Sequence, residues 1–126
     1  MKPETQEWIE KAEGDWKVAR REMSAVDSVW NFVSFLARQC AEKYLKAYLE
    51  EQNISFGKTH DLVVLLNSST GSIPELILYK QSLAKLSVFG VASRYPGAQV
   101  DQPAAHESMK TAEYVRTVVR AKLQLP

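Results

Sequence analysis

The sequence has few residues of several types, and each shortage excludes a class of protein. Its 126 residues include one cysteine, Cys40, which excludes an internal disulfide framework and a zinc site built from several cysteines. Its five glycines are scattered, so there is no glycine-rich phosphate-binding loop. No apolar run approaches the ~18 residues of a membrane-spanning helix. The N-terminus has charges every few residues and no apolar signal segment. We therefore expect a cytoplasmic protein without a membrane segment.

An excess of charge of one sign is also missing. Sixteen lysines and arginines face fifteen acidic residues, for a net charge of +1. This balance argues against a chain-wide basic field for gripping duplex DNA, although a local basic patch is compatible with it. Hydrophobic residues make up 45% of the chain and charged residues 25%, which is typical of globular domains. We expect residues 1–126 to form one domain with a sizeable core.

The spacing of the apolar residues predicts an all-α protein. Apolar side chains recur every three or four positions over residues 4–23, which indicates one face of a helix. Further helices are predicted over residues 27–51, 62–67, 72–88 and 104–123. Thr59 is the expected cap of the short third helix, a capping box from Ser72 to Glu75 opens the fourth, and Gly90 ends it. We therefore predict an antiparallel up-and-down four-helix bundle with one additional short helix.

The second predicted helix differs from the others because its first half is apolar nearly all round. Phe32 and Phe35 fall on the side opposite its main apolar stripe. Such a helix is either central in its protein or meets a second subunit. If the other helices leave these two phenylalanines uncovered, they predict a homodimer.

The side that begins with the two phenylalanines continues as a polar stripe made of Gln39, Lys43, Lys46 and Glu50. Arg38 and Glu42 lie beside it, at the four-residue spacing that favours an ion pair on a helix. One interpretation is a solvated face, which is usual for helical lysines. The alternative is that Lys43 and Lys46 supply positive charge at the edge of a binding cleft.

Two loop segments have residues that packing alone does not explain. In Lys58-Thr-His-Asp-Leu62, either Thr59 or Asp61 caps a helix and His60 folds over the loop, or these side chains bind a ligand. In Arg94-Tyr-Pro96, proline holds Tyr95 extended. An arginine clamps phosphate with a planar fork and a tyrosine stacks on a base. Alternatively, Arg94 pairs with Asp15 or Glu42 inside the bundle.

The remaining reactive residues predict neither a catalytic site nor a metal site. Cys40 lies on an apolar stripe, where a thiol is usually an inert filler. His60 and His106 belong to no metal-binding pattern. We expect no metal and no cofactor.

The order of these motifs resembles the HEPN domain family (higher eukaryotes and prokaryotes nucleotide-binding). The resemblance covers essentially the whole chain, and its matching pieces are Ala12-x-x-Asp15-x-x-x-Ala19, Ala37-x-Gln39-x-Ala41-Glu42-Lys43-x-Leu45-Lys46-Ala47, Lys58-Thr59-His60-Asp61-Leu62, Leu65-Leu66 and Arg94-Tyr95-Pro96. It implies a four-helix bundle with an extra short helix, frequent dimerisation, and a nucleotidyltransferase partner in a toxin–antitoxin pair. It further implies a nucleotide cleft lined by Lys58, His60, Asp61, Arg94 and Tyr95, with Lys43 and Lys46 at its edge.

One family feature is missing from this chain. Some members are RNases that use an arginine followed four to six residues later by a histidine, but the next histidine after Arg94 is His106, twelve residues on. The resemblance therefore favours a module that binds a nucleotide, RNA or a partner protein. A metal-independent RNase toxin, with His60 or His106 as the acid–base group, and a purely structural dimer are the alternatives.

Overall fold

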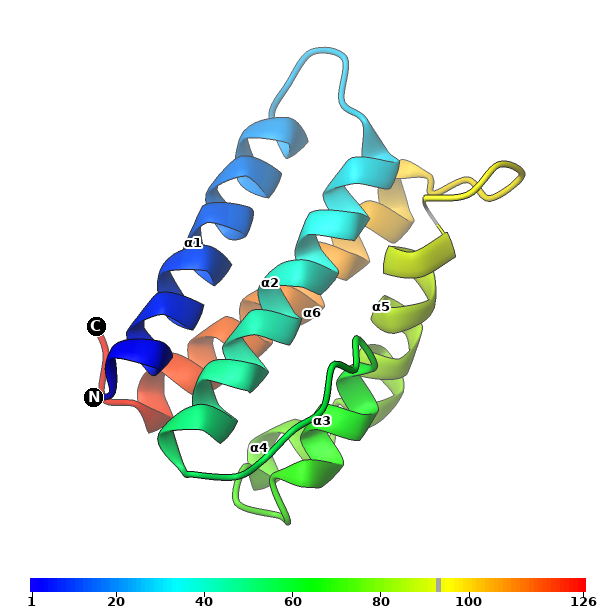
Figure 1. Ribbon diagram of the computed structural model, residues 1–126. Helices are drawn as coiled ribbons and strands as arrows, with labels where there is room; N and C mark the ends of the chain where they lie inside the picture. Colours follow the sequence, from blue (N-terminus) through cyan, green and yellow to red (C-terminus); the bar gives the residue numbers. More distant parts are fainter. Residues whose placement is uncertain (93) are drawn as a thin grey trace.

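The fold is an antiparallel arrangement of four long helices, joined by two short ones (Figure 1). The computed structural model describes residues 1–92 and 94–126. These residues form six helices and no strand: α1 (Pro3–Met23), α2 (Trp30–Glu51), α3 (Leu62–Ser68), α4 (Pro74–Ile77), α5 (Lys80–Ala92) and α6 (Gln102–Lys122). The predicted all-α bundle is confirmed, with two short helices instead of one.

Helix α2 is central, which is one of the two alternatives that its broad apolar surface left open. It packs against α1, α3, α5 and α6, and 14 of its residues are buried. Small residues allow α1 to lie close to it, since Ala12 and Ala19 of α1 and Ala37 and Ala41 of α2 are fully buried. Among the described residues, no helix is long and apolar enough to cross a membrane.

The predicted fourth helix is divided in two. Leu78 and Tyr79 form a turn between α4 and α5. This turn directs Tyr79 toward α6, where its ring stacks on that of Tyr114 with the centroids 3.7 Å apart. The neighbouring Leu78 is 88% exposed. This contact is between residues far apart in the chain, so local periodicity could not predict it.

The predicted caps were also partly wrong. Asp61, the second of the two predicted alternatives, caps α3 by accepting hydrogen bonds from the Val63 and Val64 amides, and Thr59 Oγ1 accepts one from the Asp61 amide. Ser72 does not form a capping box. Its hydroxyl donates to the Ser69 carbonyl and accepts from the Tyr48 hydroxyl instead.

Gly90 does not end α5, contrary to the prediction, and the helix continues to Ala92. Gly90 is buried against α2, at a place where the side chain of Arg38 occupies the space of a Cβ atom. Glycine is required here by the close approach of an arginine rather than by a turn. The loop predicted from Val91 to Pro103 is correspondingly shorter, and Asp101 caps α6 through the Ala104 amide.

Candidate functional site

The candidate site is built around Glu42, a carboxylate that is 4% exposed on the outer face of α2. Arg38 Nη1 donates to its Oε1 at 2.7 Å, which confirms the predicted pair one turn apart, and Lys46 Nζ donates to its Oε2 at 3.0 Å. His60 Nδ1 lies 3.1 Å from both oxygens. Three groups that carry or accept positive charge therefore meet on one buried carboxylate.

Lys46 is buried. The interpretation of the polar stripe as a solvated face is therefore wrong for this residue. It is 5% exposed, and its ammonium lies 5.5 Å from the ring centroid of Trp8 and 5.9 Å from that of Phe56. The two rings meet edge to face, at 6.1 Å. A groove of about 450 Å³ opens beside them, lined by Trp8, Lys46, Phe56, Gly57, Lys58 and His60. Such a volume is within the range of sites for small ligands.

Two guanidinium groups share the ring of Phe35, further up the same face of α2. Arg38 Cζ lies 5.6 Å and Arg94 Cζ 5.1 Å from its centroid. Burial lowers the pKa of Arg38, Glu42 opposes this effect, and the charge of Arg94 adds to the lowering. A second groove, of about 370 Å³, is lined here by Val29, Asn31, Phe32, Phe35 and Arg94. The two arginines thus bring like charges together beside an aromatic surface.

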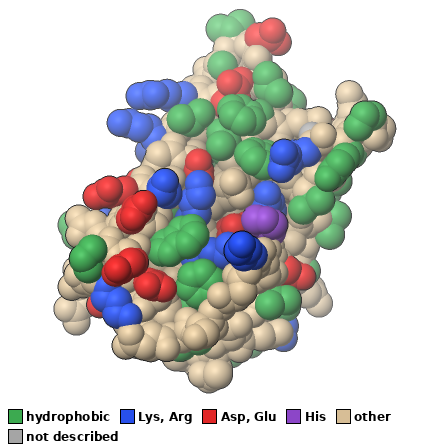
Figure 2. Space-filling view, in the orientation of Figure 1, with side chains coloured by type: hydrophobic (Ala, Val, Ile, Leu, Met, Phe, Trp, Pro, Cys, Tyr) green, Lys and Arg blue, Asp and Glu red, His purple; other side chains and the backbone are tan. Residues whose placement is uncertain are grey.

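The two loop segments singled out in the sequence lie along one face of α2. His60 contacts Glu42 and Arg94 contacts Phe35, seven positions earlier in the helix, so the contacts are about 10 Å apart along the helix axis. Figure 2 shows a histidine at the middle of this face with lysine and arginine side chains around it and apolar groups beside them. Arg38 lies between the two segments and connects them.

The structure does not bring all the predicted site residues together. Lys46, Lys58 and His60 line one groove, while Arg94 lies at the other, and Tyr95 beside it is 65% exposed. The Asp61 carboxylate is occupied with capping α3. Lys43 points toward α1, where its ammonium lies 2.6 Å from the Asp15 carboxylate. Asp15 and Glu42 thus have partners other than Arg94, against the alternative that Arg94 pairs inside the bundle.

The predicted site did not include five residues that the structure places in it or beside its grooves: Trp8, Phe35, Arg38, Glu42 and Phe56. The sequence indicated Arg38 and Glu42 as an ion pair, and Glu42 as one possible partner of Arg94. The available signal was the run Arg38-x-x-x-Glu42-x-x-x-Lys46, because charges four apart in alternating sign form a continuous row on a helix. What the run could not show is that the row is buried under His60.

A second polar cluster on another face joins α1, α2 and α6. Arg116 donates to Glu13 through Nε at 2.7 Å and Nη2 at 2.8 Å, and the Tyr44 hydroxyl donates to the same carboxylate. These bonds lower the pKa of Glu13 and raise that of Arg116. Because each polar group has its partner within the cluster, we assign it a structural role.

The antiparallel bundle places the chain among small all-α domains, and comparisons with known proteins identify the family. The HEPN domain profile matches residues 5–122. The crystal structure of an archaeal HEPN homologue is similar with a TM-score of 0.73 and 28% identity, over 97% of this chain and 98% of that chain. No curated protein matches the sequence. The chain therefore belongs to the HEPN domain family, as its motifs predicted.

Proposed function

We propose that this HEPN domain binds a phosphorylated nucleoside, as a free nucleotide or within a short RNA, in the groove beside Lys58 and His60. The observation that supports this most is the local excess of positive charge. The single carboxylate of Glu42 lies within hydrogen-bond distance of Arg38, Lys46 and His60. Lys58 and Arg94 add two more cations, neither paired with an acid among residues 1–92 and 94–126. A phosphate group supplies the missing negative charge.

The aromatic side chains of the same groove fit the other half of such a ligand. Trp8 and Phe56 line the same groove as His60, and a nucleobase stacks on aromatic rings of this kind. In the proposed complex, the base contacts these rings and the phosphates contact Lys58. An RNA longer than one nucleotide continues along α2 toward Arg94.

Calorimetric titration with ATP, GTP and a short RNA tests the proposal. We expect binding that weakens with added salt, because exposed charges are screened. Lys58→Ala is expected to weaken it about tenfold, the worth of one hydrogen bond to a charged group. Lys110→Ala, an exposed and unpaired lysine on α6, is the matched control and should leave it unchanged. If none of the three ligands produces heat, the proposal is wrong.

A second candidate function, metal-independent RNA cleavage, is favoured by the dyad of His60 and Glu42. The carboxylate holds the imidazole through Nδ1, which leaves the other ring nitrogen for proton transfer. Arg38 donates to the same carboxylate, so an arginine and a histidine meet at Glu42. Their separation in the sequence is nevertheless much longer than the four to six residues of the family's RNase motif. RNA cleavage in the presence of a chelator, abolished by His60→Ala but not by His106→Ala, is the expected result. His106 lies beside Trp30, with the rings 6.1 Å apart.

An uncovered apolar surface supports the predicted homodimer. Phe32 is 42% exposed and stacks on Phe35, with Val29 beside them at 54% exposure. Apolar side chains continue along the outer edge of α5 toward the loop before α6 (Figure 2). A contiguous patch of this kind typically marks a protein interface. Sedimentation of the wild type and of Phe32→Ser tests this part, since only the wild type should dimerise through this face.

The family resemblance also motivates a nucleotidyltransferase partner in a toxin–antitoxin pair. The neighbouring reading frame is the first observation to make. If it encodes a small nucleotidyltransferase, co-expression should yield a complex, and Arg94→Ala is expected to weaken it. If no complex forms, the proposal of a nucleotidyltransferase partner is wrong. The proposal of nucleotide binding is tested separately, by the calorimetric titration.

A further inference from the structure

The two ring nitrogens of His60 have different surroundings. Nδ1 lies 3.1 Å from both carboxylate oxygens of Glu42. The other nitrogen, Nε2, forms no hydrogen bond within the part of the chain that the structure describes. The side chain is 66% exposed and lines the same groove as Lys58. A ligand in this groove can therefore reach Nε2 but not Nδ1.

The carboxylate of Glu42 determines which of the two nitrogens carries the hydrogen. An ionised carboxylate only accepts hydrogen bonds. Glu42 accepts from Arg38 and Lys46 at the same time, as an ionised carboxylate does. Because Nδ1 contacts both of its oxygens, Nδ1 is the nitrogen that donates. A neutral His60 therefore has its hydrogen on Nδ1 and a bare lone pair on Nε2.

A bare lone pair at Nε2 is the wrong partner for a phosphate group. Phosphodiester oxygens only accept hydrogen bonds, so two acceptors would face each other. A second proton on the ring reverses this, because both nitrogens of a charged imidazole donate. Nδ1 then keeps its bond to Glu42, and Nε2 donates to the phosphate. His60 can thus hold a phosphate only after it has gained a proton.

Helix α2 brings three charged groups to His60. The Glu42 carboxylate contacts the ring, and it also pairs with Arg38 at 2.7 Å and with Lys46 at 3.0 Å. One acid is therefore shared by two cations and the imidazole. Without a ligand, this balance opposes a second proton on the ring, since positive charges already outnumber the negative one.

The other elements around the groove add one cation and one acid. Lys58 lines the groove, two residues before His60 in the same loop. The neighbouring Asp61 directs its carboxylate to amides at the start of α3. The side chain that α1 contributes is the uncharged Trp8. A phosphate in the groove offsets the excess of cations and makes protonation of His60 favourable, so binding and proton uptake assist each other.

We infer that Glu42 is a positioning residue for His60, and that the groove takes up a proton from the solvent together with the phosphate group that it binds. The inference rests on the proposed binding of a phosphorylated nucleoside and adds how that binding depends on pH. Binding strengthens as the pH falls through the range in which histidine changes its charge.

Calorimetry in buffers with different ionisation enthalpies measures the proton uptake directly. The probe is a short RNA with hydroxyl ends, since a terminal phosphate would itself gain a proton near pH 6. The dependence of the binding enthalpy on the buffer gives the number of protons taken up. We expect an uptake approaching one proton per RNA at about pH 7.5. The association constant should rise by up to about tenfold for each unit of pH removed.

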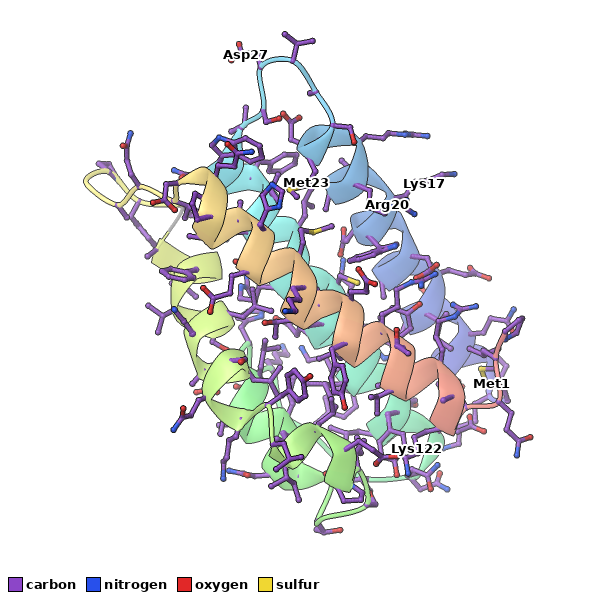
Figure 3. All side chains as sticks on the ribbon, turned by 180° about the vertical axis from the view of Figure 1, so that it is seen from behind. Met1, Lys17, Arg20, Met23, Asp27 and Lys122 are labelled. Carbon is purple, nitrogen blue, oxygen red and sulfur yellow. The ribbon has the colours of Figure 1, made fainter. Side chains whose placement is uncertain are left out.

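His60→Gln and His106→Gln are the matched variants. Glutamine keeps a hydrogen-bonding group at about the place of Nε2 but does not titrate, so His60→Gln should lose the proton uptake and the pH dependence. His106 is the other histidine of the chain and is exposed on α6. Helix α6 lies in front of α2 when the molecule is seen from behind (Figure 3), on the side away from the histidine of Figure 2. His106→Gln should leave both properties unchanged.

The tautomer of His60 provides a readout that needs no ligand. Long-range proton–nitrogen correlation spectra distinguish a protonated ring nitrogen from a bare one. Above about pH 8, where imidazoles are neutral, the hydrogen of His60 should be on Nδ1. His106 has no carboxylate partner among the described residues and should show the Nε2–H form that a solvated ring prefers.

Each outcome separates this inference from the proposed function. RNA binding without proton uptake, or with uptake that persists in His60→Gln, would overturn the inference and leave nucleotide binding intact. An Nε2–H tautomer of His60 would also overturn it. If no RNA binds at any pH, the proposed binding is wrong and this inference fails with it.

Discussion

The side chain of Arg38 occupies the space that a Cβ atom on Gly90 would need. An added Cβ would lie 2.5 Å from both Cβ and Cδ of Arg38 and 2.6 Å from its Nε. Arg38 also donates to Glu42 and is the first residue of the buried polar row Arg38, Glu42 and Lys46. The close approach of α5 to α2 therefore fixes the position of that end of the row. The position of a helix backbone and the geometry of the candidate site are thus coupled.

Gly90→Ala should destabilise the protein and disturb the site together. Overpacking of this kind costs roughly 1–3 kcal/mol, which outweighs the helix propensity gained. Gly14→Ala, the matched control in an uncrowded helix, should instead stabilise the chain by about 0.5–1 kcal/mol. Urea unfolding at low protein concentration measures both. Equal stabilisation by the two substitutions would show that Arg38 moves aside at little cost.

Glu42→Gln should be strongly destabilising. It leaves the buried ammonium of Lys46 and guanidinium of Arg38 without a compensating charge, which costs roughly 3 kcal/mol in comparable pairs. Glu113→Gln, an exposed glutamate on α6 without a partner, is the control and should change the free energy of unfolding by less than about 0.5 kcal/mol. Similar values for the two variants would mean that the buried row contributes little.

Acid should remove the stabilisation that Glu13 provides. Its pKa is lowered from the ordinary value of 4.5, chiefly by the hydrogen bonds from Arg116. The stabilisation is complete above the pKa of the unfolded chain and is lost as the pH falls from 4.5 through the lower folded value. Glu13→Gln should therefore cost about 1 kcal/mol near neutral pH and flatten the loss of stability in acid. Unfolding curves between neutral pH and about pH 3 measure both effects. Unchanged acid dependence in the variant would contradict the assignment.

Cys40 should be unreactive in the folded protein. It is fully buried on α2, and burial raises the pKa of its thiol, so thiolate is scarce. An aromatic disulfide reagent should react with it only as fast as the protein unfolds. The same measurement in urea supplies the control, where the thiol should react at once. Rapid reaction without denaturant would mean that the core opens locally around α2.

The sequence predicted the elements that depend on neighbouring residues. The apolar periodicity of α1, α2 and α6 specifies helices, because side chains three and four apart share a face whatever surrounds them. It left two alternatives for α2, a central helix or contact with a second subunit, and the fold shows that α2 is central. The family followed from motifs spread over the whole chain. The errors occurred where a residue far away in the chain determines the local backbone structure. Examples are the turn at Tyr79, whose ring stacks on Tyr114, and Gly90, which packs against Arg38.

The sequence by itself determined the helical class, the family and the residue types available to a site. Only the tertiary structure decided which of those residues act together. The loop before α3 lies over α2 and brings His60 to Glu42, which also binds Lys46. Packing against α1 pairs Lys43 with Asp15 instead. The physical reason is that a charge on a helix face is solvated or buried according to what other elements place over it. That depends on contacts between residues far apart in the chain, which no local pattern contains.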